Sequence, residues 1–450
     1  MPHPRPPQPD GGSAPGPVRN RRAPLVAGLL LVLAALLATG GLRAARGLPF
    51  WPHLPGLGGR ASRPVAIEVG FAWPEYPARL RSTDPQLLSR IYRALLAARA
   101  AAPRRGERLA SESQPDPHFA YWTLTLVDRA GRRHVLFISA GGRFHDPHYG
   151  PLPRAGDLWE AVRPLLARLE ERFFGEPVPW ERVDRLWARD AVAVIRDLES
   201  GRRFRVSRFG GTQHADAEPV TPADTAVLRS LYGGAWSWRR RAVVLELGER
   251  RIAASINGMP HGEGVIADND FPGHFCVHTL RSTTHGGDRV DPAHHLMILK
   301  SSGRLVRALR DAAPHQVVGY LLVALANGDV ATAAHMVTDP GTGTWQEESA
   351  RLARGLVFVE LGPAKTVSID PAGREARVEV QVDAWYSDGA EGGHGRHHLV
   401  WRLARRSGFW TVPAEQLREL RPGGAQATLA PPAIFRECLG WRGREESGLR

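Results

Sequence analysis

Strand-like and helix-like spacings of apolar residues follow one another over residues 64–178. A Pro inside an otherwise helical pattern ends or kinks the helix, so Pro164 predicts a kink or a delayed start in the second of two helices. The pattern indicates a small α+β domain, and we find no catalytic motif in it. The expected elements are strands at 64–73, 118–127 and 133–138 and helices at 84–101 and 157–174.

A different pattern, of short alternating strands between polar loops, runs over residues 183–305 and indicates a mostly-β domain. Residues 212–219 and most of the histidine-rich stretch after 256 are expected to be polar loops. A further helix is expected to start at Asp291, with His294 and His295 on its solvated face. The expected strands form two β-hairpins, 191–195 with 203–209 and 241–247 with 251–256.

The last pattern, over residues 313–420, is an apolar-periodic helix (315–336), broken at Asn327-Gly328, followed by long strands of one antiparallel sheet. This order, with the pattern AL..GD...AA at 324–334, resembles the nuclear-transport-factor-like, or SnoaL-like, fold. The resemblance implies a cone-shaped α+β domain, and such domains often serve as accessory modules without an activity of their own. Residues 421–450 are expected to form a flexible tail.

Residues 23–42 form an uncharged apolar stretch behind an Arg-bearing, Pro/Gly-rich segment, 1–22. A helix of about twenty such residues spans the roughly 30 Å of a bilayer core, and arginines before it favour a cytoplasmic N-terminus. We therefore expect a disordered cytoplasmic tail, a single-pass anchor in the cell membrane, a linker at 47–63 and an extracytoplasmic remainder. The alternative is a cleaved signal peptide, which would leave the rest secreted.

The expected fold class is thus multidomain α+β, with four parts in order. They are an N-terminal transmembrane helix, a small α+β domain, a mostly-β central domain and a cone-shaped C-terminal α+β domain.

The net charge of +13 says little about partners, because nearly all of the cationic side chains are arginines. Lys300 and Lys365 are the only lysines, and an Arg-, Ala-, Gly- and Pro-rich composition is typical of a GC-rich genome. We find no basic stripe with interleaved aromatic residues, so we expect no nucleic-acid partner. A basic exterior would attract an anionic polymer such as the cell wall.

Candidate chemistry gathers around Cys276, one of two cysteines, which stands among histidines. Residues two apart on a strand share a face, so His274 and His278 would flank Cys276 if this piece is a strand. His261 would reach the same place from a neighbouring loop. An imidazole there would lower the thiol pKa and serve as base, and amides near 273–276 would form an oxyanion hole.

Other interpretations of the same residues stay open. Cys276 would form a disulfide with Cys438 in an oxidising compartment, or it would be a buried inert thiol. Alternatively, His214 and Asp216 would bind zinc together with later histidines, among them His285, because imidazoles and a carboxylate suit a hydrolytic zinc site. The plain interpretation of His214 and Asp216 is hydrogen bonding within a loop.

The segment also resembles the L,D-transpeptidase family of cell-wall enzymes. His261-Gly262 matches the family's His-Gly, and residues 273–278 (GHFCVH) match its Ser/Thr-His-Gly-Cys stretch, with Gly273, Phe275 and His278 as departures. The resemblance implies that Cys276 is acylated, that His261 or His274 is the base and that His278 is a second orienting group. It implies cleavage of a peptidoglycan tetrapeptide stem at a D-alanine, followed by acyl transfer to a neighbouring stem's amine.

The wider run from 210 to 286 is similar to a group of exported bacterial proteins that have no assigned activity. We therefore expect a membrane-anchored envelope protein with an L,D-transpeptidase-like cysteine acyltransferase domain and no cofactor. The alternatives are a non-catalytic module that binds or supports the cell wall, and a metal-dependent peptidoglycan hydrolase that uses zinc.

Overall fold

The computed structural model describes residues 63–102, 120–284, 289–387 and 393–421, which all belong to one compact unit, His53–Arg450. Several expectations fall outside these ranges. They are the apolar stretch at 23–42 with its flanking tail and linker, the C-terminal tail, and the residues His285 and Cys438.

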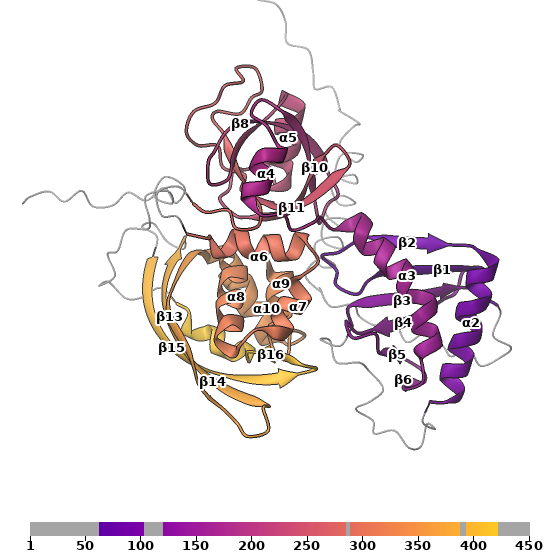
Figure 1. Ribbon diagram of the computed structural model, residues 1–450. Helices are drawn as coiled ribbons and strands as arrows, with labels where there is room; N and C mark the ends of the chain where they lie inside the picture. Colours follow the sequence, from indigo (N-terminus) through magenta and orange to yellow (C-terminus); the bar gives the residue numbers. More distant parts are fainter. Residues whose placement is uncertain (1–62, 103–119, 285–288, 388–392, 422–450) are drawn as a thin grey trace, which may run out of the picture. The chain divides into compact units, whose positions relative to one another are not determined.

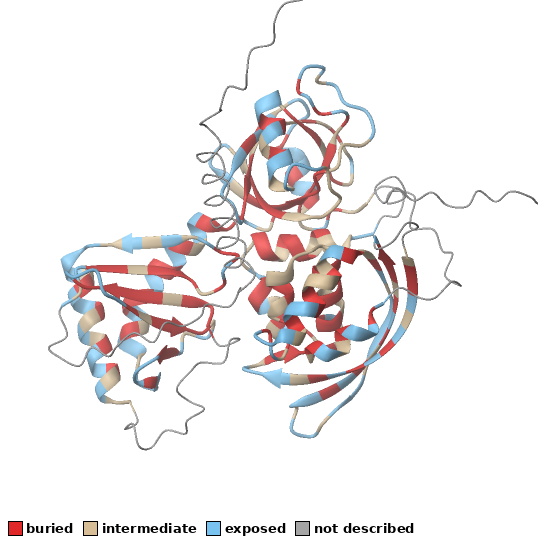
Figure 2. Cartoon of the chain, turned by 180° about the vertical axis from the view of Figure 1, so that it is seen from behind, coloured by how far each residue is buried: buried red, intermediate tan, exposed pale blue. Residues whose placement is uncertain are grey.

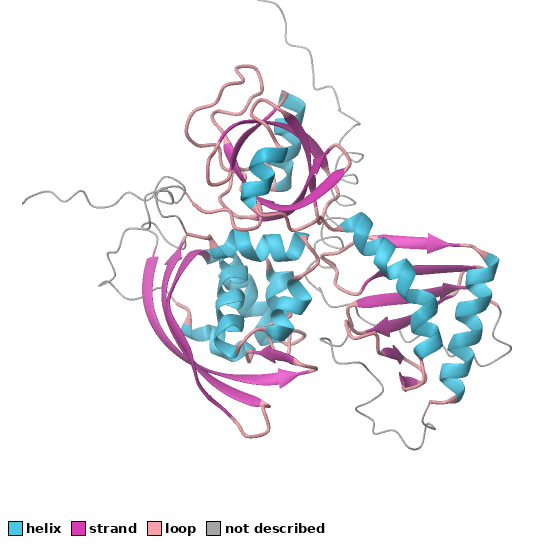
Figure 3. Ribbon diagram, viewed as in Figure 1, coloured by secondary structure: helices cyan, strands magenta, loops and turns pink. Residues whose placement is uncertain are grey.

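The first domain is an antiparallel sheet with two helices against one face (Figures 1 and 3). The Asp84 carboxylate caps the first helix by accepting from the amides of Gln86 and Leu87. The second helix starts well before Pro164 and continues through it, so the delayed start is wrong. The strand order is β2-β1-β3-β4-β5-β6, and the elements are β1 (Ala66–Phe71), β2 (Arg79–Ser82), α2 (Pro85–Ala100), β3 (Trp122–Val127), β4 (Arg133–Ile138), β5 (Phe144–Asp146), β6 (Gly150–Leu152) and α3 (Gly156–Phe173).

The second domain is a closed antiparallel barrel with the strand order β10-β11-β12-β9-β8-β7 (Figure 1). Both predicted hairpins are confirmed as β7 with β8 and β10 with β11. The other two strands, β9 and β12, lie in segments expected to be polar loops. The elements are α4 (Trp180–Leu186), β7 (Val192–Asp197), β8 (Arg203–Gly210), β9 (Ala215–Pro219), α5 (Pro222–Leu231), β10 (Arg241–Leu247), β11 (Arg250–Ile256), β12 (Phe275–His278) and α6 (Pro292–Ser301).

Alternate residues of each barrel strand face the interior, as the period of a strand requires. Phe275 and Val277 of β12 belong to the apolar cluster that fills the barrel, together with Ala215 and Ala217 of β9. The residues between them therefore face outward. On the outside, α6 packs against β10 and β11, and this arrangement encloses polar side chains against the barrel wall.

The third domain is a curved four-stranded sheet, in the order β13-β14-β15-β16, with helices in its hollow (Figure 1). Buried and exposed residues alternate along β14, as Figure 2 shows for the curved strands. The predicted break at Asn327-Gly328 is confirmed: it separates α8 from α9, and Gly328 has φ +71°. The elements are α7 (Leu305–Asp311), α8 (Pro314–Ala326), α9 (Val330–Ala334), α10 (Gly343–Gly355), β13 (Leu356–Ile369), β14 (Glu375–Tyr386), β15 (Gly393–Arg406), β16 (Phe409–Thr411) and the 3-10 helix η3 (Ala414–Glu419).

The expected fold class is wrong and is corrected here. The described residues form a mixed α/β structure with a closed six-stranded barrel, and none of their helices is long and apolar enough to cross a membrane. Barrel closure was missed because β9 and β12 are short and carry His, Asp and Glu on their outward positions, which weakens the strand pattern. The SnoaL-like resemblance stays a prediction.

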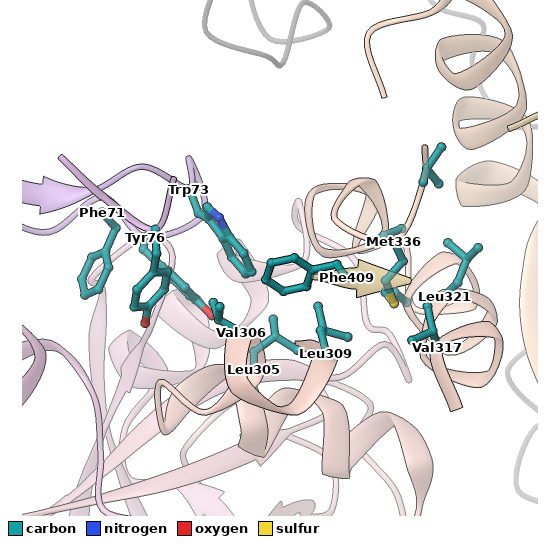
Figure 4. Packing of buried hydrophobic residues seen from close by; sticks show 14 of the residues in the cluster. Phe71, Trp73, Tyr76, Leu305, Val306, Leu309, Val317, Leu321, Met336 and Phe409 are labelled. Carbon is teal, nitrogen blue, oxygen red and sulfur yellow. The ribbon is translucent and has the colours of Figure 1, made fainter. Parts of the chain in front are cut away.

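Apolar packing continues from the first domain to residues of the third (Figure 4). Trp73 stacks on His335, with the ring centroids 3.4 Å apart, and His335 Nε2 lies 2.9 Å from the Glu75 carboxylate. In the same buried cluster, Val306 of α7 and Phe409 of β16 lie beside Trp73 (Figure 4).

Lys300 of α6 forms buried ion pairs that join the β7–β8 hairpin of the barrel to α9 beside the curved sheet. Its fully buried ammonium donates to Glu199 Oε1 at 2.6 Å and to Asp329 Oδ2 at 2.8 Å. Glu199 lies in the β7–β8 hairpin and Asp329 caps α9. Because both carboxylates compensate one buried charge, removing the lysine leaves Asp329 buried without its cation.

The two lysines of the chain allow a matched test of this pair. Lys300→Met should lower the free energy of unfolding by about 3–5 kcal/mol, the usual cost of breaking a buried ion pair from one side. Lys365→Met removes an exposed pair with Glu379 and should cost at most about 1 kcal/mol. Urea unfolding of both variants checks the difference, and equal losses would contradict the assigned role of Lys300.

Candidate functional site

The predicted His-Gly and the Cys-bearing segment are joined by a pair of backbone hydrogen bonds. The His261 amide donates to the His274 carbonyl at 3.0 Å, and the His274 amide donates to the His261 carbonyl at 2.9 Å. Gly262 follows His261 and Gly273 precedes His274, because a side chain at either position would clash with the facing histidine. A Cβ on Gly262 would lie 2.5 Å from the His274 ring, and one on Gly273 would lie 2.6 Å from the His261 carbonyl oxygen.

This bridge places His261 against the sulfur of Cys276. His261 Nε2 lies 3.2 Å from Cys276 Sγ, and His261 Nδ1 lies 2.9 Å from the Met259 carbonyl oxygen. A carbonyl accepts only, so Nδ1 carries the proton and Nε2 keeps its lone pair for the thiol. The thiol, the imidazole and an orienting carbonyl therefore stand in the order that a nucleophile, its base and a third group require.

The thiol is neutral at rest. Burial first, and the Asp216 carboxylate second, raise the pKa of Cys276 to about 12, although a hydrogen bond from the Asn257 side chain acts in the opposite direction. The expectation of a lowered thiol pKa is wrong, because desolvation outweighs the neighbouring donors. Attack by this sulfur would need His261 to take the proton as the new bond forms.

Three buried imidazoles are stacked beside Cys276 on the outer face of the barrel. The His278 ring lies between those of His214 and His294, with centroid separations of 4.2 and 3.7 Å. Burial, and then the neighbouring imidazoles, hold the pKa of His278 well below its ordinary value, so the ring is neutral. His294 Nδ1 lies 2.9 Å from the hydroxyl of Ser255 on β11, so the expectation of a solvated His294 is wrong.

The acidic residues of β9 have separate roles. Asp216 is paired with Cys276 in the β9–β12 register, and its Oδ1 lies 3.5 Å from His214 Nε2 and 3.7 Å from His274 Nε2. Glu218 accepts from the amides of Val265 and Ile266 and holds the loop between β11 and β12. Asp216 therefore belongs to the site, and Glu218 supports its shape.

A small hollow of about 50 Å³ lies near this cluster. Trp238 lines it and also contacts His261, with ring centroids 4.8 Å apart. Phe358 and other apolar residues of β13 form another wall, and the ion pair of Arg240 with Asp291 lies at its side. The hollow therefore offers apolar and charged surface, and Trp238 stands between it and the thiol–imidazole pair, since neither Cys276 nor His261 is among its lining residues.

The structure brings together most of the predicted site residues. Cys276, His261, His278, His214 and Asp216 gather on the outer face of the barrel. His274 lies at its edge, and its Nδ1 faces the Glu263 carbonyl oxygen at 2.9 Å.

The expected oxyanion hole is partly wrong. The Gly273 and His274 amides already donate to the carbonyls of Phe271 and His261. Cys276 is a free cysteine in the described part of the chain, and Cys438 lies outside that part.

Sequence reasoning missed Asn257, Met259, Trp238 and His294 at this site. Only Asn257 carries a recognisable signal, because Ser255 and Asn257 are polar at alternate positions of an otherwise apolar strand segment. Met259 contributes its backbone carbonyl. Every residue type has one, so it gives no signal in the sequence.

Comparison with known proteins adds no assignment: no protein-family model matches the chain, and no curated protein matches it.

The electrostatics of Cys276 predict opposite effects for two neighbours. In a Cys438→Ser background, Asp216→Asn should speed alkylation of Cys276 by iodoacetamide at pH 8, because removing that carboxylate lowers the thiol pKa. Asn257→Ala should slow alkylation, because it removes the hydrogen bond that lowers the pKa. Each unit of pKa is worth about tenfold in thiolate. Intact-mass spectrometry measures the alkylation rates. If both variants changed the rate in the same direction, the roles assigned to Asp216 and Asn257 in setting the pKa of Cys276 would be contradicted.

Proposed function

We propose that the barrel is a cysteine acyltransferase that acts on peptidoglycan stem peptides in the manner of the L,D-transpeptidases. The observation that carries the proposal is the 3.2 Å contact of Cys276 Sγ with His261 Nε2, with His261 held by the Met259 carbonyl. The matching positions of His261-Gly262 and of His274, two residues before the cysteine, support the comparison with that family. A role on the cell wall requires export, which the N-terminal sequence predicts.

The first half-reaction forms a thioester on Cys276. The sulfur attacks the stem carbonyl that precedes the terminal D-alanine, while its proton passes to His261 Nε2. The amide bond then breaks, and His261 returns the proton to the departing amine of D-alanine. The Met259 carbonyl stabilises the imidazolium that forms in between, because it accepts from Nδ1.

The second half-reaction reverses these roles. The amine of a neighbouring stem attacks the thioester carbonyl and gives its proton to His261, and the thiol of Cys276 is restored as the new amide forms. A raised thiol pKa is compatible with this cycle, because the thiolate need exist only as a leaving group or a partly formed nucleophile.

The substrate would bind along the surface around the small hollow beside Trp238. Its apolar wall at Val357, Phe358 and Val359 belongs to β13, which pairs with β14 on one side. An extended peptide along this surface would have to pass Trp238 to bring its reacting carbonyl to His261, because Trp238 contacts both the hollow and that ring. The proposal therefore places the stem peptide between the barrel and the edge of the curved sheet.

A carbapenem tests the nucleophile directly, because attack on its β-lactam carbonyl leaves the whole molecule bound to the sulfur. We expect wild-type protein to gain one carbapenem mass and Cys276→Ala to gain none. His261→Gln should acylate about 10²–10⁴-fold more slowly, the usual contribution of a general base. Intact-mass time courses followed by peptide mapping measure both effects.

His398→Gln is the matched histidine control. His398 is exposed on the curved sheet and contacts Glu379, so its removal should leave the acylation rate unchanged. A carbapenem adduct that survives in Cys276→Ala, or equal acylation rates for His261→Gln and His398→Gln, would contradict the proposed function.

A further inference from the structure

We propose that His214, Cys276 and His278 form a zinc site that competes with the Cys276–His261 pair. One ligand atom from each of the three residues lies within 4.8 Å of the others, and all three residues are buried. The regulatory meaning of this site rests on the proposed acyltransferase function, whereas the binding of the metal does not.

The donors suit zinc in type and number. A thiolate and two imidazoles are ligands that Zn²⁺ prefers, and three protein ligands leave the open fourth position found in exchangeable and catalytic sites. Bond lengths of about 2.0–2.3 Å place donors around one zinc about 3.3–3.6 Å apart. The three donors lie within 4.8 Å of one another, so metal binding would have to draw each pair together by at most about 1.5 Å.

The surroundings of the two histidines support ligation. His214 Nδ1 lies 2.8 Å from the Thr283 carbonyl oxygen, which fixes the proton on Nδ1 and directs the Nε2 lone pair toward the cluster. Such a carbonyl partner is the usual support of a metal-bound histidine. His278 Nδ1 is buried and has no hydrogen-bond partner among the described residues. A bound cation would supply the partner that this buried nitrogen lacks.

Zinc and the acyl-transfer pair need the same sulfur. On binding, the S–H bond of Cys276 breaks, the sulfur's electron pair forms the bond to Zn²⁺, and the proton leaves to solvent or to His261. The thiolate is then held by the metal on the His214–His278 side and no longer donates to His261. The zinc-bound protein therefore cannot perform acyl transfer, and removal of zinc restores the free thiol of Cys276.

Untagged full-length protein with Cys438→Ser tests the site with zinc alone. Equilibrium dialysis should find one zinc per chain, and saturating zinc should slow iodoacetamide alkylation of Cys276 more than tenfold. His278→Asn and His214→Gln should each lose the zinc and its effect, with each variant compared against its own rate without metal. His295→Gln, a change on α6 outside the three ligands, should keep both.

Cobalt(II) tests the site without mutating any of the three ligands, so the result does not depend on whether a variant folds. The wild-type ligand set should show a thiolate-to-cobalt charge-transfer band, and prior alkylation of Cys276 should abolish it. Absence of bound zinc, full zinc binding in His278→Asn or Cys276→Ala, or zinc binding without slower alkylation would each overturn the site. Zinc binding with protection, but with no carbapenem adduct in metal-free protein, would uphold the site and reject the acyltransferase.

Discussion

Closure of the barrel is the constraint on which the site depends. In a closed wall every strand residue faces either the apolar interior or the outside, and a shift of one residue would exchange the two sets. Phe275 and Val277 fill the interior, so Cys276 and His278 must face outward, beside Asp216 of β9. Helix α6 packs on the neighbouring strands β10 and β11, and its His294 ring stacks on His278. A surface of polar residues thereby becomes a buried cluster, and its burial determines its chemistry.

That chemistry is governed by desolvation. Burial raises the thiol pKa of Cys276 to about 12 and lowers the pKa of His278, so both groups are neutral at rest. The neutral thiol lies 3.2 Å from His261 Nε2, an arrangement suited to proton transfer during attack rather than to a standing thiolate. The same sulfur lies between His261 on one side and the His214–His278 pair on the other. Proton transfer and metal binding are therefore alternative uses of one atom.

The sequence was informative where its periodicity was strong. The hairpins β7–β8 and β10–β11 and the capped helix α2 lie within a few residues of their predicted positions. It failed at β9 and β12, because a four- or five-residue strand with His, Asp or Glu on its outward side has the composition of a polar loop. Cys276, His261 and His278 were predictable from residue type and spacing. Met259 acts through its backbone, and His294 through packing of α6 on the barrel, so neither had a signal in the sequence.

We propose that Cys276 carries the acyl group during turnover. The most direct measurement is to incubate the metal-free protein with a tetrapeptide stem that ends in D-alanine, quench in acid and map the modified peptide by mass spectrometry. We expect a thioester of the tripeptide acyl group on Cys276, with release of one D-alanine for each acylated chain. Release of D-alanine by Cys276→Ala, or an acyl group on another residue, would contradict it.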